Sequence, residues 1–450
     1  MPPAAATADH ACHVLVLGAG LAGMRAAWAA KEAAPALSVT LLCPHRKPSG
    51  SSFANRNNAL GVQAPLPHEA ETFVAEALRL ARPGEAAPEL VRALADDAPA
   101  RLGDLLSLGL NFRREPDGSL TRFPGCFSAV PRAVVFDGLA QAHAAFQAKV
   151  QGLGVRLVHG FEALELLQDD TGRVRGARLA NLRNGTATTV RADAVVAALG
   201  GPAPLFGRRL CGPGGSGLAY GLLHRAGARL MNARFLQFFW GRARGKAFVN
   251  PGALPWPEEL ASLAAARRTH CPVAYGLPDA ALDRELLARR GADGLVRLPG
   301  TEQEPLALFA HAGNGGARID AQGHTTTPGL YACGECAGGM HGAQRLGGGM
   351  VLSALVFGAR AGRAAAQEAL EKTAFGKDAA TLRPLASGLD LPADAAFVRR
   401  LRRGMDRHAA PFAERSPAFA AWLAVQSHEA ASMRQRLLAL SALLVLGEES

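Results

Sequence analysis

The chain has few charged residues: Asp, Glu, Lys and Arg make up 19% of its 450 residues, against about 25% in an average globular protein. Hydrophobic residues make up 49%, which excludes widespread disorder and allows a large buried core. Long apolar runs are also missing. The run near the end, Leu437–Leu446, is interrupted by Ser441 and is too short to span a bilayer. The first residues lack the basic segment and apolar core of a signal peptide.

Cysteine and lysine are both sparse. Seven cysteines at irregular spacing do not form the pattern of a disulfide framework, so we expect a reducing compartment and a cytoplasmic protein. The formal net charge is +11, but only six of the 49 basic residues are lysine. The arginines are scattered, with one dense cluster at 399–403. A solvated basic face fits this pattern better than a nucleic-acid site, and an anionic small substrate suits the charge equally well.

Glycine is abundant, at 51 residues, and its placement predicts an α/β fold. An apolar strand at 13–17 leads into glycines, then a helix at 21–34 that stops at Pro35, then a strand at 38–42. This is the opening of a βαβ unit. Further on, we predict helices at 67–107, 137–152, 350–372 and 392–446, and strands within 155–200. The pattern loosens from 234 to 310, as expected for an insertion. The predicted domains are 10–234 with 311–385, an inserted domain at 235–310, and a helical region at 386–450.

The segment Gly18-Ala19-Gly20-Leu21-Ala22-Gly23 follows the first strand directly. In a dinucleotide-binding turn the first glycine allows the turn, the second admits a pyrophosphate, and the third lets the helix pack on the strand. The alternative is a plain glycine turn. One feature departs from the pattern. The second strand should end in an acid for the ribose hydroxyl, but it reads LLCPHRK, with Cys43 near the expected place.

A second glycine-rich stretch runs from 330 to 362 and contains Cys333 and Cys336. Their spacing suits either a redox dithiol or a loop with two cysteines, and the absence of a thioredoxin-type helix start favours the loop. Three glycines at 347–349 precede a long apolar helix. The free N–H groups at such a helix start stabilise negative charge, as on the N1 edge of a reduced flavin.

Arg345 and His311 are the candidate substrate residues. Arg345 lies in a glycine-rich segment where a bulky cation has little packing role, and a guanidinium binds a carboxylate through two hydrogen bonds. The alternatives are a structural ion pair for Arg345 and an ordinary loop histidine for His311.

These motifs resemble the flavoprotein family of fumarate reductase, succinate dehydrogenase and L-aspartate oxidase. The resemblance rests on GAGLAG at 18–23, AALGG at 197–201, AHAGNGGARID at 310–320 and the long ordered segment at 325–358. It is good over 10–235 and 311–371, weak over 392–449 and poor over 239–310. It implies a doubly wound, Rossmann-like FAD-binding domain, a shortened inserted α+β capping domain and a C-terminal helical segment. It also implies hydride transfer between flavin N5 and a small carboxylate such as fumarate, succinate or aspartate.

The resemblance assigns roles to individual residues. Arg345 matches the arginine that clamps a substrate carboxylate, His311 the substrate histidine, and Glu335 a glutamate near the FAD ribityl chain. The loop at 50–58 matches the one lying over the flavin. No histidine stands where respiratory members attach FAD, so we expect non-covalent FAD, and we predict no metal. The expected FAD contacts are Gly18, Gly20, Leu21, Ala22, Gly23, Ser51, Ser52, Gly200, Gly201, Gly334, Glu335, Gly348, Val351 and Leu352.

The inserted segment departs from the family pattern. The family's QFHPT reads QFFWG here, so Phe239 replaces a histidine and Gly241 a threonine. Phe cannot hydrogen-bond to a carboxylate. The family's TGDG reads GGSG at 214–217, and HGANRLGGNSL loses an Asn and a Ser. Arg244 is a candidate for the family's proton-donating arginine, although that alignment crosses a deletion.

Three functions remain open at this point. The first is an FAD-dependent enzyme acting on a carboxylic acid other than plain succinate or fumarate. The second is a flavoprotein electron-transfer subunit that works with an iron–sulfur partner. Such a partner would be the chain's link to a membrane, because the sequence contains no candidate transmembrane segment. The third is an FAD-binding scaffold without turnover. Replacement of the histidine by Phe239, with Trp240 beside it, favours the second; retention of Arg345 and His311 favours the first.

Overall fold

The computed structural model describes residues 10–298, 304–374 and 393–447. At its centre is a seven-stranded sheet in the order β7-β2-β1-β10-β9-β8, with β15 beside the C-terminal end of β10. Strands β7, β2, β1, β10 and β15 are parallel, whereas β8 and β9 form an antiparallel hairpin beside β10. The bounds are β1 (His10–Leu17), β2 (Val39–Cys43), β7 (Arg156–His159), β8 (Phe161–Gln168), β9 (Val174–Asn181), β10 (Ala187–Ala197) and β15 (Leu330–Ala332). All five residues of β2 are buried, which explains why Thr40 is its one polar residue.

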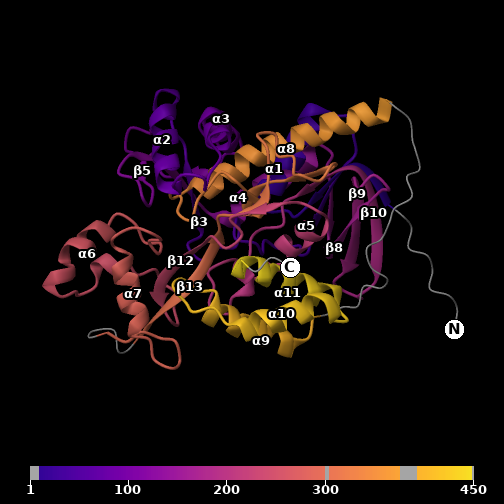
Figure 1. The fold of residues 1–450 in the computed structure, drawn as a ribbon. Coiled ribbons are helices and arrows are strands. Elements are labelled where there is room, and N and C mark those ends of the chain that lie inside the picture. Colours follow the sequence, from indigo (N-terminus) through magenta and orange to yellow (C-terminus); the bar gives the residue numbers. More distant parts are fainter. Residues whose placement is uncertain (1–9, 299–303, 375–392, 448–450) are drawn as a thin grey trace.

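Two long helices cross the sheet side by side, α1 (Leu21–Ala33) and α8 (Gly349–Ala374) (Figure 1). They approach closely because glycines of α8 face α1. A Cβ on Gly358 would lie 2.7 Å from the carbonyl oxygen of Ala22, and one on Gly362 would lie 2.0 Å from that of Ala26. Helix α4 (Leu139–Gly152) covers α1 further, with Phe146 edge-on to Trp28. The N-terminal ends of α1 and α8 therefore open on the same edge of the sheet.

A second, smaller layer surrounds this edge. A sheet of β3 (Ala59–Gln63), β6 (Pro131–Asp137), β4 (Asn111–Phe112) and β5 (Phe123–Pro124) lies under α2 (Ala70–Ala81) and α3 (Pro88–Ser107). Short pieces complete the layer: a sheet of β11 (Leu230–Met231), β14 (Gly316–Arg318) and β16 (Ala337–Gly338), and the 3₁₀ turns η1 (Pro67–Glu69), η2 (Ala203–Leu205) and η5 (Gly334–Cys336).

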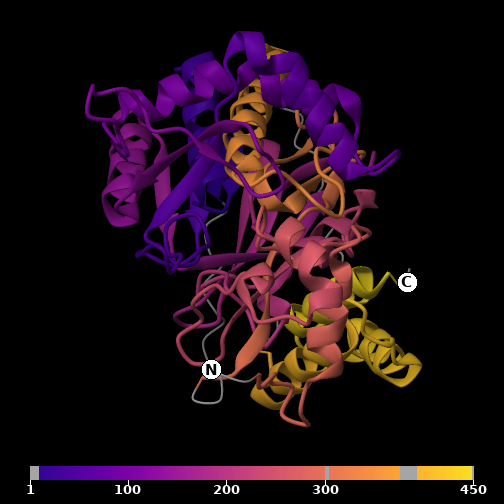
Figure 2. The same cartoon turned by 90° about the vertical axis from the view of Figure 1, so that its left-hand side faces the viewer.

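The segment between the two flavoprotein-like stretches is built on an antiparallel ribbon, β12 (Leu236–Arg242) with β13 (Leu306–Gly313). Between these strands lie η3 (Pro251–Ala253), η4 (Glu258–Leu260), α6 (Ala261–Arg267) and α7 (Ala280–Ala288). Figures 1 and 2 show α6 and α7 projecting from one side of the molecule. We call residues 243–298 the inserted segment.

Three helices close the chain: α9 (Ala395–His408), α10 (Pro417–Glu429) and α11 (Met433–Leu446). They gather on the side of the molecule away from α2 and α3. Helix α11 packs on α5 (Ala219–Arg225), where Ser441 Oγ accepts the backbone N–H of Gly221 at 2.8 Å. Its apolar residues are therefore core residues. Among the helices of the described ranges, none has the length and apolar character needed to cross a bilayer. The predicted boundary at 385/386 lies outside the described residues.

Candidate functional site

A cavity of about 570 Å³ lies at the carboxyl ends of β1, β10 and β15. In open α/β sheets this edge is where ligands bind, because helix N-termini and loops converge there. The walls come from the β1–α1 turn, the loop after β2, the glycines after β10 and β15, and the first turn of α8. Predicted residues that line it are Gly18, Gly20, Leu21, Ala22, Ser51, Ser52, Gly200, Gly201, His311, Gly334, Glu335, Arg345, Gly348 and Val351.

The three glycines of the β1–α1 turn have different structural roles. Gly18 has a φ of +108°, and a Cβ there would lie 2.2 Å from the carbonyl oxygen of Ala198. A Cβ on Gly23 would lie 1.8 Å from the carbonyl oxygen of Gly18, so this glycine permits strand–helix packing. Gly20 is different, because the nearest atom to its Cβ would be Ser52 Oγ, at 3.4 Å. The protein leaves space above Gly20, beside the free N–H groups of the α1 N-terminus, which is where a pyrophosphate would lie.

A second glycine cradle surrounds Glu335. The Glu335 carboxylate accepts the backbone N–H of Gly313 at 2.9 Å, and a Cβ on Gly201 would lie 2.1 Å from Glu335 Oε1. Burial raises the pKa of Glu335 above its ordinary value. The first turn of α8 follows nearby, with Met350, Val351 and Ala354 in the wall. The cavity thus has two helix N-termini, from α1 and α8, and both favour negative charge.

Arg345 reaches this cavity from the loop before α8 and is 7% exposed. Its Nη1 donates to Gln237 Oε1 at 3.0 Å and to Asn314 Oδ1 at 3.5 Å, and its Nε has no partner. In the part of the chain that the structure describes, no carboxylate lies within 4 Å of the guanidinium, so Arg345 is not half of a structural ion pair. Burial lowers the pKa of Arg345 to about 10, which leaves it charged at neutral pH. Its hydrogen bonds go to neutral amides, and Glu335 and Cys126 attract it only without direct contact, so an anionic ligand would stabilise this buried cation further.

His311 lies on β13 with its ring edge-on to Phe239, at 4.9 Å between centroids. Phe248 lines the same part of the cavity. Burial, assisted by the charge of Arg345, lowers the pKa of His311 to about 3. The ring is therefore neutral at pH 7, and its Nδ1 has no partner among the described residues. A neutral imidazole with a free nitrogen suits hydrogen bonding to a ligand.

Three predicted residues do not line the cavity. Arg244 is exposed in the turn after β12, because the alignment that pointed to it crosses a deletion. Gly23 serves helix packing, as described above. Leu352 is fully buried in the core and is not part of the cavity wall.

The cysteines of the CxxC spacing are both buried. Cys336 Sγ donates to the carbonyl oxygen of Ala197 at 3.3 Å. Burial raises the pKa of Cys333 well above its ordinary value and that of Cys336 to about 11. Thiols of this kind are inert, so the geometry favours the loop interpretation over a redox dithiol.

Sequence reasoning missed several residues of the cavity. Gln237 and Asn314 do not line the cavity themselves but accept hydrogen bonds from Arg345. The one sequence signal for them was a polar residue inside an apolar or glycine-rich run. Glu162, on β8, supplies a buried carboxylate to the cavity wall and lies 3.2 Å from Arg434 Nε. Cys126 and Cys271 line the cavity together although they are far apart in sequence, so local patterns carried no signal for them.

Comparisons with known proteins agree with this geometry. Residues 13–242 and 265–351 match the family described as FAD binding domain. The L-aspartate oxidase of Caulobacter vibrioides is 33% identical, over 88% of this chain and 82% of that protein. The fumarate reductase flavoprotein subunit of Mycobacterium tuberculosis is 30% identical, over 81% of this chain and 70% of that protein.

Solved structures show the same fold. The apo Mycobacterium smegmatis Sdh1 complex matches with a TM-score of 0.75 at 22% identity, covering 98% of this chain and 86% of that chain. The quinol fumarate reductase of E. coli gives 0.70 at 20% identity, covering 98% and 88%. The chain therefore belongs to the FAD-binding flavoprotein family that includes L-aspartate oxidases and the flavoprotein subunits of fumarate reductase and succinate dehydrogenase, and it is an FAD-dependent oxidoreductase.

Proposed function

We propose that the chain holds FAD non-covalently and transfers a hydride between flavin N5 and a carbon of a small carboxylic acid. The observation that carries this proposal is the buried guanidinium of Arg345, which faces the cavity without a carboxylate partner in the described residues. A substrate carboxylate would supply the missing charge through a two-point hydrogen bond. Bound FAD supplies the hydride acceptor or donor.

The two glycine cradles fit FAD. The space above Gly20 would accommodate a pyrophosphate, and the backbone N–H of Leu21 donates to Ser52 Oγ at 3.2 Å. Glu335, Gly201 and Gly348 would surround the ribityl and ring portions, as the family resemblance implies. The N-terminus of α8 would stabilise negative charge on the ring edge. These residues bind and orient; none of them forms a covalent link.

The substrate side of the cavity suits one carboxylate better than two. Arg345 orients that carboxylate, and neutral His311 donates or accepts one hydrogen bond beside it. Phe239 and Phe248 make the neighbouring wall apolar, which disfavours a second charged group there. We therefore propose an acid that is fumarate-, succinate- or aspartate-like but less polar at its far end.

The test is a titration of the FAD-loaded protein with a panel of mono- and dicarboxylates, followed by the flavin absorbance. An acid that binds shifts the spectrum. Arg345→Ala weakens binding about 30-fold or more, because removing one partner of a buried charge pair costs about 2–5 kcal/mol. Arg244→Ala, which removes an exposed arginine outside the cavity, is the matched control and leaves the response unchanged.

Two results would refute the assignment: no acid perturbs the flavin, or Arg345→Ala with full FAD content binds as tightly as the wild type. FAD retained in the precipitate after acid treatment would contradict non-covalent binding.

A second candidate is an electron-transfer subunit with an iron–sulfur partner. It is favoured by Phe239, which removes a hydrogen-bonding side chain, and by relatives that are named as flavoprotein subunits. Trp240 no longer bears on the choice, because it is buried and donates to Asp283 Oδ1 at 2.9 Å, a packing role. A flavin that ignores every acid but is rapidly reduced by a partner protein would favour this candidate. In that case the partner would also supply any association with a membrane surface.

A further inference from the structure

Two cysteines from separate parts of the chain meet in the cavity. Cys126 follows β5, in the layer next to the main sheet, whereas Cys271 follows α6, in the inserted segment. Both line the cavity that contains Arg345, and each thiol lies close enough to the other to shift its pKa. Both are free thiols and neither is fully buried.

The neighbours of each cysteine hold it in place. The backbone N–H of Gly347 donates to the Cys126 carbonyl oxygen at 2.9 Å, which ties this loop to the segment of Arg345. His270, next to Cys271, stacks on Phe127, next to Cys126, with centroids 4.2 Å apart and an interplanar angle of 25°. This stacking brings the segment of Cys126 against the segment of Cys271.

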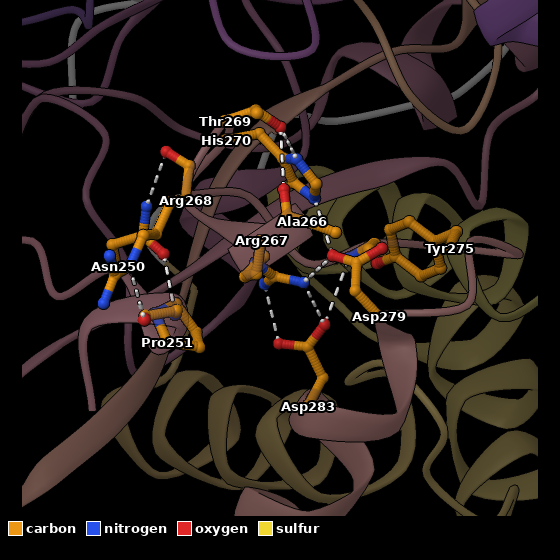
Figure 3. A network of polar contacts seen from close by, with 12 residues as sticks. Asn250, Pro251, Ala266, Arg267, Arg268, Thr269, His270, Tyr275, Asp279 and Asp283 are labelled. Carbon is orange, nitrogen blue, oxygen red and sulfur yellow. Dashed lines mark hydrogen bonds and ion pairs between the residues drawn. The ribbon is translucent and has the colours of Figure 1, made fainter. Parts of the chain in front are cut away.

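A buried ion network anchors the inserted segment beside Cys271 (Figure 3). Arg267 is fully buried and donates to both carboxylate oxygens of Asp283, at 2.7 and 2.8 Å, and to Asp279 at 3.2 Å. Asp279 lies 2.9 Å from His270 Nε2 on its other side. This network fixes the backbone that presents Cys271, so its contact with Cys126 does not depend on an isolated loop.

The surroundings give the two thiols unequal acidity. Interaction with the Cys271 thiol, assisted by the nearby charges of His270 and Arg345, lowers the pKa of Cys126 to about 6. The same contact and burial raise the pKa of Cys271. Cys211, which lines the same cavity without such a partner, has its pKa raised by burial to about 11. Cys126 is thus the nucleophile, since the thiolate is the reactive form, and Cys271 is positioned to react second.

We propose that Cys126 and Cys271 are a thiol–disulfide exchange site whose oxidation links the inserted segment covalently to the FAD-binding part of the chain. The co-reactant is a small aliphatic disulfide. The Cys126 thiolate attacks one sulfur of that disulfide and releases one thiolate, giving a mixed disulfide. Cys271 then loses its proton, attacks the Cys126 sulfur and releases the second small thiolate. The protein loses two protons and two electrons, and one small disulfide becomes two thiols.

The link would change the substrate side of the cavity. It would tether the segment above the cavity within reach of Arg345, so oxidation should hinder entry of a carboxylate and reduction should restore it. This consequence rests on the proposed function, whereas the formation of the bond does not.

The experiment equilibrates the reduced, FAD-loaded protein with oxidised glutathione and then measures free thiols, intact mass and cysteine-containing peptides. We expect two of the seven thiols to disappear, the mass to fall by two hydrogens, and one cross-linked peptide to join Cys126 to Cys271. Dithiothreitol should reverse all three changes. Cys126→Ser and Cys271→Ser should form no internal cross-link, whereas the matched control Cys211→Ser should still lose two thiols.

Three outcomes would overturn the proposal: no thiol is lost, a different pair is joined, or glutathione stays on Cys126 without being displaced by Cys271. Wild-type peptide mapping is decisive even if a variant folds poorly. Because the readout is covalent mass, a disulfide that forms while no acid perturbs the flavin would leave this proposal intact and remove only the proposed substrate.

Discussion

Substitutions at the three glycines of the β1–α1 turn separate effects on FAD binding from effects on the stability of the apoprotein. Gly23→Ala places a methyl 1.8 Å from the carbonyl oxygen of Gly18, so strand and helix must move apart. Overpacking of this kind costs about 1–3 kcal/mol. Gly20→Ala meets only Ser52 Oγ, at 3.4 Å, and the φ of −76° at Gly20 suits alanine. Its cost to the apoprotein should stay below about 1 kcal/mol.

The two variants should rank in opposite order when FAD binding is measured. The added methyl of Gly20→Ala occupies the space between the α1 N-terminus and the pyrophosphate. Hydrogen bonds to a charged group are worth about 1.5–3 kcal/mol, so loss of one weakens FAD binding about 10- to 150-fold. Gly23→Ala lies outside the cavity wall and should reduce affinity less than it reduces the apoprotein's stability.

The assay uses apoprotein from acid precipitation, with thermal unfolding for stability and quenching of FAD fluorescence for affinity. We expect the Tm of Gly20→Ala to stay close to that of the wild type while its Kd for FAD rises. The reasoning fails if Gly20→Ala binds FAD as tightly as the wild type, or if it destabilises the apoprotein as much as Gly23→Ala.

Three further outcomes follow from the substrate side and the inserted segment. Phe239→His adds a hydrogen-bonding ring to the cavity and should tighten dicarboxylate binding about 2- to 12-fold, since a net hydrogen bond is worth about 0.5–1.5 kcal/mol; an unchanged flavin titration would contradict this. Because its pKa is lowered to about 6, the Cys126 thiol is mostly thiolate above that pH, so its alkylation rate should level off near pH 7. Cys271→Ala removes the neighbouring thiol and should move the pH midpoint of Cys126 alkylation upward. A wild-type midpoint near the ordinary pKa of a thiol would count against the contact between the two cysteines. Arg267→Leu leaves buried carboxylates unpaired, a loss of about 3–5 kcal/mol, and should speed proteolysis within residues 243–298 and abolish the cross-link to Cys126; resistance equal to the wild type would show that the network is dispensable.

Local sequence patterns were enough to predict the glycine turn and the helix starts that line the cavity. The strand, turn and helix around Gly18–Gly23 are contiguous in sequence. One local pattern therefore predicts both the strand–helix unit and the edge of the sheet at which the α1 N-terminus lies. The same is true of the helix after Gly348. The isolated cation Arg345 could be singled out because a glycine-rich segment gives a long side chain little to pack against.

The substrate half could not be predicted in the same way. Arg244 was misplaced because a shortened insertion changes which residues face the cavity, and no local periodicity records that change. Cys126 and Cys271 meet only through the tertiary position of the inserted segment, which the buried pairing of Arg267 fixes. The role of an amide such as Gln237 depends on the residue to which it is hydrogen-bonded, here Arg345, which is distant in sequence.

The antiparallel ribbon of β12 and β13 carries Gln237, Phe239 and His311, whereas the glycines that would cradle FAD belong to the main sheet and its helices. In the proposed function, the ribbon side chains would select the acid together with Arg345, while the main sheet and its helices would retain the cofactor. Substitutions at Gln237, Phe239 and His311 would then change which acid is accepted and leave FAD binding intact. Evolution or protein engineering can thus alter substrate preference separately from cofactor binding.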